Sequence, residues 1–518
     1  MDRGPRLGRA ATRQPRLPGG RDVTWGALSA PIDVSSHERV RTRQTPAGRR
    51  AERAREVRPQ GLRVVPRPSL VRRLTSRAVN QALLDELVDW LRIPSISTGE
   101  GDPAQLERAA AWVVERVRGA GGEGRLVTID GGNPLAVGEL RAADPAAPTV
   151  LIYGHYDVQS PGAPDAWTSP PFEPTVRDGR LYARGASDDK GNFLPLLHVA
   201  CALARDGALP VHVRVLVEGE EEVGGRSVAR WLAGDERGAD AAIVFDSGGE
   251  EPGVPTVTVG LRGLVHLRVR VRTGERDLHS GLYGGAALNA AHVLHAMLAA
   301  VVPAPGGRVR DELRAGIVAP ADAERASWAR LKPGEQVLAD VGARPADPRA
   351  GAEFYERNWA DASLDVNEIV TGEPRTVIPS TAVATVSLRL APRQRAADLA
   401  PVLERLLRDA APPGAEVELS EHRADSALFD VEDPVLRAAG QAMERACGTP
   451  ALFIRSGGSI PIVADLAARG IPTVVSGFAV PADRIHAPDE SYLLRSLELG
   501  EASARELLPA LAGASHQS

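Results

Sequence analysis

Short, mainly apolar runs limit the folds open to this chain of 518 residues. They are Val150–Tyr153, Val213–Val217 and Ala241–Phe245, each bounded by glycine, proline or charged residues. Between them, apolar residues recur at helical spacing at about 191–205 and 225–233. Strands that are buried on both faces read as continuous apolar runs, so this alternation predicts a largely parallel sheet covered by helices on both sides. We therefore expect an α/β fold.

A different pattern begins near residue 264. Over 264–272 and again over 381–390, apolar residues alternate with polar ones, as in strands with one wet face. Helical patterns and shorter strands complete this region, at 286–300, 364–370, 396–408 and 416–420. The order β-α-β-β-α-β matches the ferredoxin-like arrangement, so we expect an α+β domain inserted into the α/β domain.

The chain is too long for one ordinary domain, and we divide it into four segments. Further helices are expected at 79–92, 104–119, 433–447 and 490–511, whereas 303–360 shows the least regular pattern. The predicted segments are an extension (1–75), the first part of the α/β domain (76–261), the inserted α+β domain (262–424) and the second part of the α/β domain (425–518).

The extension is rich in Arg, Pro and Gly and has no sustained hydrophobic period, which predicts disorder. Three interpretations stay open: a basic arm for nucleic acid, a targeting peptide, or sequence upstream of the true start. We favour the third, which predicts that the native protein begins near residue 70. The extension has no apolar stretch of the kind that a secretory signal needs.

Composition excludes several classes of protein. The two cysteines, Cys201 and Cys447, are too few for a disulfide scaffold or a cysteine-based zinc site. A metal would therefore need His, Asp and Glu ligands. No apolar run approaches the ~18 residues of a membrane span, and we expect a cytoplasmic protein without membrane contact.

Ionisable residues follow the apolar runs. In an α/β sheet, ligands bind at the carboxyl ends of the parallel strands, so these residues are candidates for a binding site. The first run leads into His155-Tyr156-Asp157, in which the imidazole can bind a metal while the carboxylate fixes its tautomer. A second motif, Gly185–Gly191, contains the adjacent pair Asp188-Asp189. A hydrogen-bonded turn and a helix cap, respectively, would also explain these two motifs.

Three further signals follow the same logic. Four carboxylates crowd into Glu218–Glu222 after the second run; they form either a solvated acidic turn or a metal site in which one Glu takes a proton from activated water. Asp246 follows the third run, and His486 stands in a later loop. Together they supply five nitrogen or oxygen ligands, enough for two divalent ions such as zinc, manganese or cobalt that share one carboxylate: His155, Asp188, Glu222, Asp246 and His486.

These motifs resemble the M20 family of metallopeptidases, nearest its dipeptidase (carnosinase-like) branch. The resemblance spans about 78–515 and includes the blocks GHYDVQ, GASDDKG, EGEEEVGG, DLHSG, GGSIP and IHAPDE in order. It implies that His155 and Asp246 bind one metal, that Glu222 and His486 bind the other, and that Asp188 bridges them. Asp157 would orient His155. Glu221 would be the general base, although Glu220 also precedes a Glu.

The resemblance also implies roles for residues outside the ligand set. The inserted domain matches the family's lid, which dimerises. His279 would reach a partner subunit's active site and stabilise the oxyanion, unless it only caps a turn. Arg389 would grip a substrate carboxylate. Further substrate contacts are expected at Thr376, Gly458 and Ser459.

The activity that the resemblance implies is metal-dependent hydrolysis of dipeptides or short peptides by a homodimer. An N-acyl amino-acid deacylase of the same family is the alternative, and a non-catalytic binding protein is a remote one. Val223 and Gly225 depart from the polar residues usual in the dipeptidase branch, which leaves the substrate open. We expect no specific nucleic-acid partner.

Overall fold

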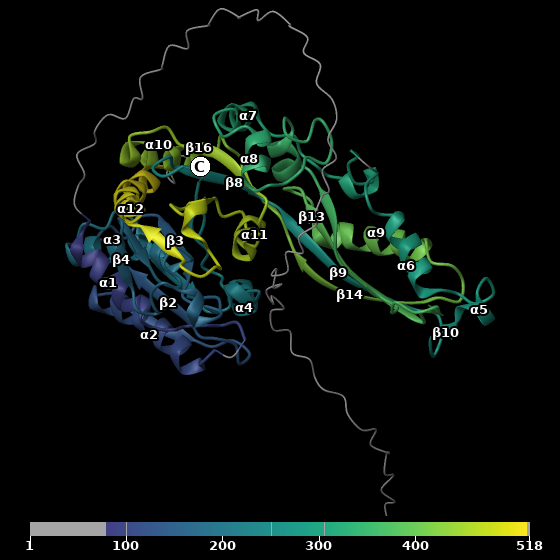
Figure 1. Cartoon of the computed structure of the whole chain (residues 1–518). Helices are drawn as coiled ribbons and strands as arrows, with labels where there is room; N and C mark the ends of the chain where they lie inside the picture. Colours follow the sequence, from purple (N-terminus) through teal and green to yellow (C-terminus); the bar gives the residue numbers. More distant parts are fainter. Residues whose placement is uncertain (1–78, 100, 250, 305, 515–518) are drawn as a thin grey trace, which may run out of the picture. The chain divides into compact units, whose positions relative to one another are not determined.

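The computed structural model describes residues 79–99, 101–249, 251–304 and 306–514. The prediction of a disordered extension over 1–75 therefore lies outside the described residues. Within the described ranges, no helix is both long and apolar enough to cross a membrane. The α/β fold with an inserted α+β region, expected from the two sequence patterns, is confirmed (Figure 1).

In the described part of the chain, nine strands form the larger sheet. Its centre is parallel, in the order β6-β3-β7-β17, and antiparallel strands flank it. The strands are β1 (Glu123–Val127), β2 (Leu135–Leu140), β3 (Thr149–His155), β6 (His212–Glu218), β7 (Ala241–Phe245), β8 (Thr256–Leu261), β15 (Ala427–Leu428), β16 (Leu452–Ser456) and β17 (Thr473–Ser476).

Both faces of this sheet are covered, as its continuous apolar strands require. Alternate residues of β3 enter different cores: Ile152 joins one cluster and Leu151 the other. Helices α1 (Gln81–Leu91), α2 (Pro103–Gly119), α3 (Lys190–Arg205), α10 (Pro434–Cys447) and α12 (Leu494–Ala514) supply the first core, and α4 (Arg226–Ala233) and α11 (Pro461–Ala468) the second.

Local signals explain where several helices begin. The Asp102 side chain accepts the backbone N–H of Ala104 at 2.9 Å, and the Asp433 side chain accepts that of Val435 at 2.8 Å. A proline follows each aspartate at the first helical position, where no N–H is needed.

Two predicted helix starts were wrong. The helix expected from residue 286 begins as α6 (Ala290–Ala299), because the Asn289 side chain caps it. The helix expected from 490 begins at residue 494, because the preceding residues form β18 (Ser491–Leu493). This strand pairs with β5 (Arg180–Tyr182), which also pairs with β4 (Thr175–Arg177), and the long-range pairing overrides the helical pattern.

The inserted region contains a four-stranded antiparallel sheet in the order β11-β13-β9-β14. Its alternating strands bury one face against α6 and α9 (Ala396–Asp409) and form a core of their own. Figure 1 shows these helices along the sheet. The strands are β9 (Gly263–Arg272), β11 (Ser363–Thr371), β13 (Thr381–Leu390) and β14 (Glu416–Ala424). The boundaries predicted for this domain stay predictions.

Shorter elements fill the remaining segments. The residues between α6 and β11 contain η3 (Asp311–Arg314), α7 (Asp322–Trp328), α8 (Gly334–Asp340) and a π-helical turn, η4 (Glu356–Ala360). The others are β10 (Leu278–His279), β12 (Val377–Ile378), α5 (Ser280–Tyr283), η1 (Pro164–Ala166), η2 (Glu221–Val223) and η5 (Pro481–Asp483).

Candidate metal and catalytic site

The carboxyl ends of neighbouring parallel strands bring the predicted site residues together. His155 is the last residue of β3, and Asp246 follows the adjacent strand β7. On the other side of β3, the acidic segment that contains Glu221 and Glu222 follows β6. His155 is completely buried, with its ring Nε2 3.8 Å from Asp246 Oδ1.

Asp188 lies between the two predicted histidine ligands. Its Oδ1 is 2.9 Å from His155 Nε2, and its Oδ2 is 2.9 Å from His486 Nε2. His486 comes from a loop 298 residues further along the chain. Each oxygen of the Asp188 carboxylate therefore faces a different imidazole, which is the arrangement that a bridging ligand needs.

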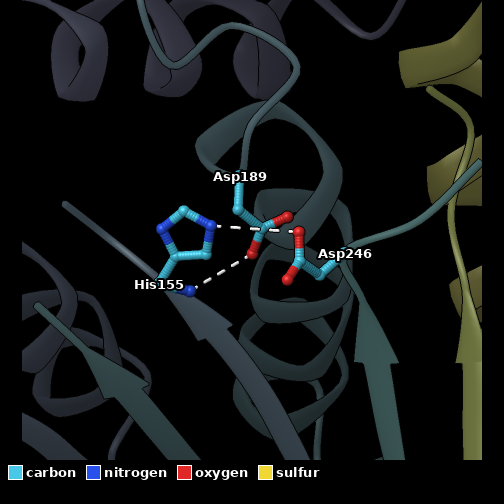
Figure 2. Close-up of side chains that lie close together, drawn as sticks. All are labelled: His155, Asp189 and Asp246. Atoms are coloured by element: carbon cyan, nitrogen blue, oxygen red, sulfur yellow. Dashed lines mark hydrogen bonds and ion pairs between the residues drawn. The ribbon is translucent and has the colours of Figure 1, made fainter. Parts of the chain in front are cut away.

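Asp189 joins this cluster, although the sequence predicted no ligand there. Ligand atoms of His155, Asp189 and Asp246 lie within 4.8 Å of one another, and Figure 2 shows the three side chains converging. Asp189 Oδ2 accepts the backbone N–H of His155 at 3.2 Å. That bond engages Asp189 with the strand end, whereas Asp188 faces both imidazoles, so we regard Asp188 as the better candidate for a bridge.

Asp188, Glu222 and His486 form a second group of potential ligands. His486 Nε2 is 3.2 Å from Glu222 Oε1, and Gln159 Nε2 donates to Glu222 Oε2 at 2.8 Å. Behind this group lies Asp157, whose Oδ2 accepts the Glu222 backbone N–H at 3.2 Å. His155 Nδ1 is 3.0 Å from the backbone carbonyl oxygen of Asp157 and 3.4 Å from its Oδ1, so Asp157 can orient the ring.

The adjacent residues Glu220 and Glu221 have different surroundings in the structure. The Glu220 carboxylate accepts the backbone N–H groups of Asn133 and Ser227, both at 2.9 Å, so both its oxygens hold loops in place. Glu221 begins the turn η2, and its electrostatic neighbours are His155 and Asp188. This geometry favours Glu221 over Glu220 as the candidate base.

The electrostatics of the cluster match a cation site. Burial, reinforced by neighbouring carboxylates, raises the pKa of Asp246 well above its ordinary value. Burial opposes a proton on His155, but its hydrogen bonds to Asp157 and Asp188 outweigh this and raise its pKa. Three candidate carboxylate ligands and the half-buried Glu221 lie around two imidazoles. A divalent ion would relieve that repulsion, and the oxygen and nitrogen donors suit zinc, manganese or cobalt.

We expect the metal-free protein to lose stability as the pH rises from about 5 to 7. Burial raises the pKa of Glu221 to about 7 and that of Glu218 to about 8, against an ordinary 4.5. In this window the folded state keeps protons that the unfolded chain releases, so stability present at pH 5 is lost as the pH rises. Melting curves of chelated protein should show Tm falling by a few degrees, and Glu221→Gln should flatten the slope. A Tm that rose over this window would contradict the assignment.

A buried network that the sequence did not reveal holds the Asp188 loop. The Glu490 carboxylate accepts the backbone N–H groups of Gly185, Ser187 and Asp188 at 3.1, 2.9 and 3.2 Å. Arg184 Nη1 donates to the same carboxylate at 2.6 Å. Glu490 lies in the IHAPDE block, but nothing local in that block indicates its partners some 300 residues earlier.

Asn192 ties a further set of segments together. Its Nδ2 donates to Ser187 O at 3.1 Å, while its Oδ1 accepts Phe478 N and the Tyr492 hydroxyl, both at 2.9 Å. The loop that carries Asp188 is therefore fixed from two sides before any ligand binds.

His279, expected to reach a partner subunit, lies beside Thr376, an expected substrate contact. His279 is in β10 and pairs with Val377 of β12, next to Thr376. Both His279 and Thr376 are exposed, and Ser280 N donates to Thr376 O at 3.0 Å. His279 Nδ1 accepts Gly281 N at 3.0 Å, so the capped turn is present. In the described ranges, no hydrogen bond or ion pair joins either residue to the candidate ligands.

The other predicted substrate contacts are spread over two elements. Arg389 is half-buried on β13, and in the described part of the chain no carboxylate pairs with it. Gly458 and Ser459 lie in the loop between β16 and α11. This loop is held to the inserted region by Arg262, whose Nη1 donates to Ser363 Oγ and whose Nε donates to Gly457 O.

Imidazoles and carboxylates cluster at the carboxyl edge of a parallel sheet, with the half-buried Glu221 beside them. This is the arrangement of a metal-dependent hydrolase. The chain belongs to peptidase family M20/M25/M40, whose family model matches residues 151–509. The resemblance drawn from the sequence motifs is thereby confirmed, as is the expected class of enzyme.

Known proteins are similar over most of the chain. It is 32% identical over 401 residues to a cysteinylglycine-S-conjugate dipeptidase of Corynebacterium striatum, covering 74% of this chain and 86% of that protein. It is 27% identical over 357 residues to the Beta-Ala-His dipeptidase of Homo sapiens, covering 64% and 68%. The solved structure of an M20 family metallo-carboxypeptidase from Sulfolobus solfataricus is similar with a TM-score of 0.73 and 25% identity, covering 83% and 99%.

Proposed function

We propose that this protein hydrolyses the amide bond of dipeptides or short peptides. The position of Asp188, 2.9 Å from each of two imidazoles, carries the proposal, because a bridged pair of metal ions needs such a carboxylate. The names of the two similar dipeptidases support a peptide substrate.

In this proposal two divalent ions, zinc by preference and otherwise manganese or cobalt, occupy the cluster. His155 and Asp246 hold one, Glu222 and His486 hold the other, and Asp188 contacts both. When bound, the ions supply the Lewis acidity that activates water and polarises the amide carbonyl. Asp157 keeps the His155 ring in place, and the Glu490 network keeps Asp188 in place.

Glu221 is the proposed general base. Its burial beside the cluster keeps its pKa near neutrality, which suits a group that takes a proton from water and returns it to the leaving amine. Arg389 has no carboxylate partner in the described part of the chain and would bind the terminal carboxylate of a short substrate bidentately. Gly458 and Ser459 would contact the substrate from their loop.

A homodimer completes the proposal. His279 and Thr376 are exposed together on the β10–β12 ribbon, which supports a role at the active site of a partner subunit. There His279 would stabilise the oxyanion of the tetrahedral intermediate. A single-chain mass in light scattering of the active enzyme would count against this. The cytoplasmic location and the absence of a nucleic-acid partner stay predictions.

The test compares chelated protein with protein given zinc, manganese or cobalt on a panel of dipeptides and N-acyl amino acids. We expect the metal-loaded protein alone to cleave dipeptides, because the proposed water has no activator without the ions. Cleavage of N-acyl amino acids only would replace the proposal with a deacylase. No cleavage of either class by protein with two ions bound would contradict both activities.

A further inference from the structure

A cavity of about 540 Å³ opens beside the candidate metal site. Asp188 and Asp246 line one end. The end of β16 and the loops that follow β7 and β17 also line it, and Leu331 and Trp359 reach it from the long segment between α6 and β11. Small-molecule sites typically have volumes of about 300–1,000 Å³, so the cavity has the size of a binding pocket.

Away from the aspartates, apolar side chains share the wall with polar ones, which are Ser187, Asn192, Ser247, Thr256, Arg455, Ser456 and Arg484. Ile454 is almost fully buried, whereas Trp359 and Leu331 are half-buried and therefore accessible to a ligand. The apolar members of the lining include Leu331, Trp359, Ile454, Val480, Pro481 and Ile485. Such a surface binds aliphatic or aromatic groups by removing apolar area from water.

Aromatic packing fixes the position of Trp359. Its ring lies edge-on to Trp328, with centroids 5.4 Å apart and planes at 79°, and 4.5 Å from the Tyr355 ring. Trp328 is itself buried, at 6% exposure. The wall is therefore already formed in the protein alone, which lowers the entropic cost of binding.

A buried ion pair anchors this segment to the larger sheet. Arg455 Nε and Nη2 of β16 donate to the two oxygens of Glu324 of α7, at 2.5 and 3.0 Å. Both residues are almost fully buried, at 1% and 3% exposure. Ser327 Oγ accepts the backbone N–H of Phe453 at 3.2 Å beside this pair. The bidentate geometry sets the register of α7 on β16 and so the position of the wall.

The charges of the wall disfavour a basic occupant. Among the described residues that line the cavity, the carboxylates are Asp188 and Asp246, which the proposed metals would occupy. Glu324 neutralises Arg455, and Arg484 is exposed to solvent. In the described part of the wall, a cationic side chain would find no free carboxylate, whereas an acidic one would meet Arg484 and the Nη1 of Arg455, which has no hydrogen-bond partner in the described residues.

We propose that this cavity selects dipeptides whose N-terminal residue carries a bulky apolar side chain. The inference rests on the proposed function, in which Arg389 holds the C-terminal carboxylate. Arg389 is not among the residues that line the cavity, and we assign the cavity to the residue on the other side of the scissile bond. Leu331 and Trp359 are then specificity-determining residues.

The experiment measures kcat/KM of the metal-loaded full chain on Ala-Gly, Leu-Gly, Phe-Gly and Lys-Gly. We expect Leu-Gly and Phe-Gly to exceed Ala-Gly by about tenfold or more, the range that hydrophobic pockets achieve, with Lys-Gly weakest. Trp359→Ala should reduce the Phe-Gly to Ala-Gly ratio about tenfold, mainly through KM. Val341→Ala, at a site 74% exposed in the same segment, is the matched control and should change no ratio.

A second variant keeps the test decisive if Trp359→Ala does not fold. Leu331→Trp fills the cavity and should reduce the Phe-Gly to Ala-Gly ratio by a comparable factor. Dipeptide cleavage without apolar preference, or ratios unmoved in both folded variants, would overturn the inference and leave the proposed function standing. Failure of the wild type with two ions bound to cleave any dipeptide would instead overturn the proposed function and the inference with it.

Discussion

Glu221→Gln should lower kcat by about 10²–10⁴-fold, the contribution typical of a positioned general base, while the protein keeps its metal ions. Glutamine has nearly the same shape as glutamate but cannot accept the proton of the attacking water. Because Glu221 is not among the proposed ligands, metal content measured by elemental analysis should equal that of the wild type. Steady-state kinetics on a dipeptide would supply the rate.

Glu220→Gln is the matched control one residue away. Glu220 accepts the backbone N–H groups of Asn133 and Ser227 and so serves the loop and the start of α4. We expect this change to reduce stability modestly, since an amide oxygen still accepts one of the two bonds, and to leave kcat within a few-fold. If Glu220→Gln abolished turnover and Glu221→Gln did not, the base would be Glu220.

Asp188→Ala should remove both the metal pair and the activity. Asp188 is the one side chain within 2.9 Å of both His155 and His486 in the described part of the chain, so its loss separates the two halves of the cluster. Metal ions supply several kcal/mol of transition-state stabilisation, and about 4 kcal/mol corresponds to about a thousandfold in rate. We expect fewer than two ions per chain and at least that loss in kcat/KM.

Asp189→Asn tests whether the carboxylate next to Asp188 also binds the ions. Asp189 lies in the group with His155 and Asp246, but its contact to His155 is to the backbone N–H. An asparagine oxygen can accept the same bond, so we expect two ions per chain at saturating metal and a loss of activity of no more than about 10–100-fold, the range typical of residues that support metal ligands. Equal loss of metal in both variants would show that Asp189, and not Asp188 alone, binds the ions.

The comparison of Glu220 with Glu221 shows where reasoning from sequence stops. The pattern places an acidic segment after β6, because a buried parallel strand must be apolar and its polar residues must follow it. Which of the adjacent carboxylates faces the cluster depends on backbone dihedrals in a turn that the local sequence does not fix. The structure resolves this through the contacts of Glu220 with Asn133 and Ser227.

Glu490 illustrates the same limit at longer range. Its burial and its bonds to the Asp188 loop depend on β18 pairing with β5, about 310 residues away. The helical periodicity near residue 490 gave the opposite local expectation. Pairing between distant strands is decided by which faces bury together, and this information is absent from any local window.

The sequence by itself determined β3, β6 and β7 of the parallel centre, their polar ends and the antiparallel strands of the inserted sheet, but not β17. Those features follow from side-chain periodicity, which each segment carries alone. Only the tertiary structure decided that Asp188 faces two histidines, that Glu490 holds its loop, and that Trp359 walls a cavity beside them. These are contacts between segments far apart in the chain, and packing of the assembled layers, rather than local preference, determines them.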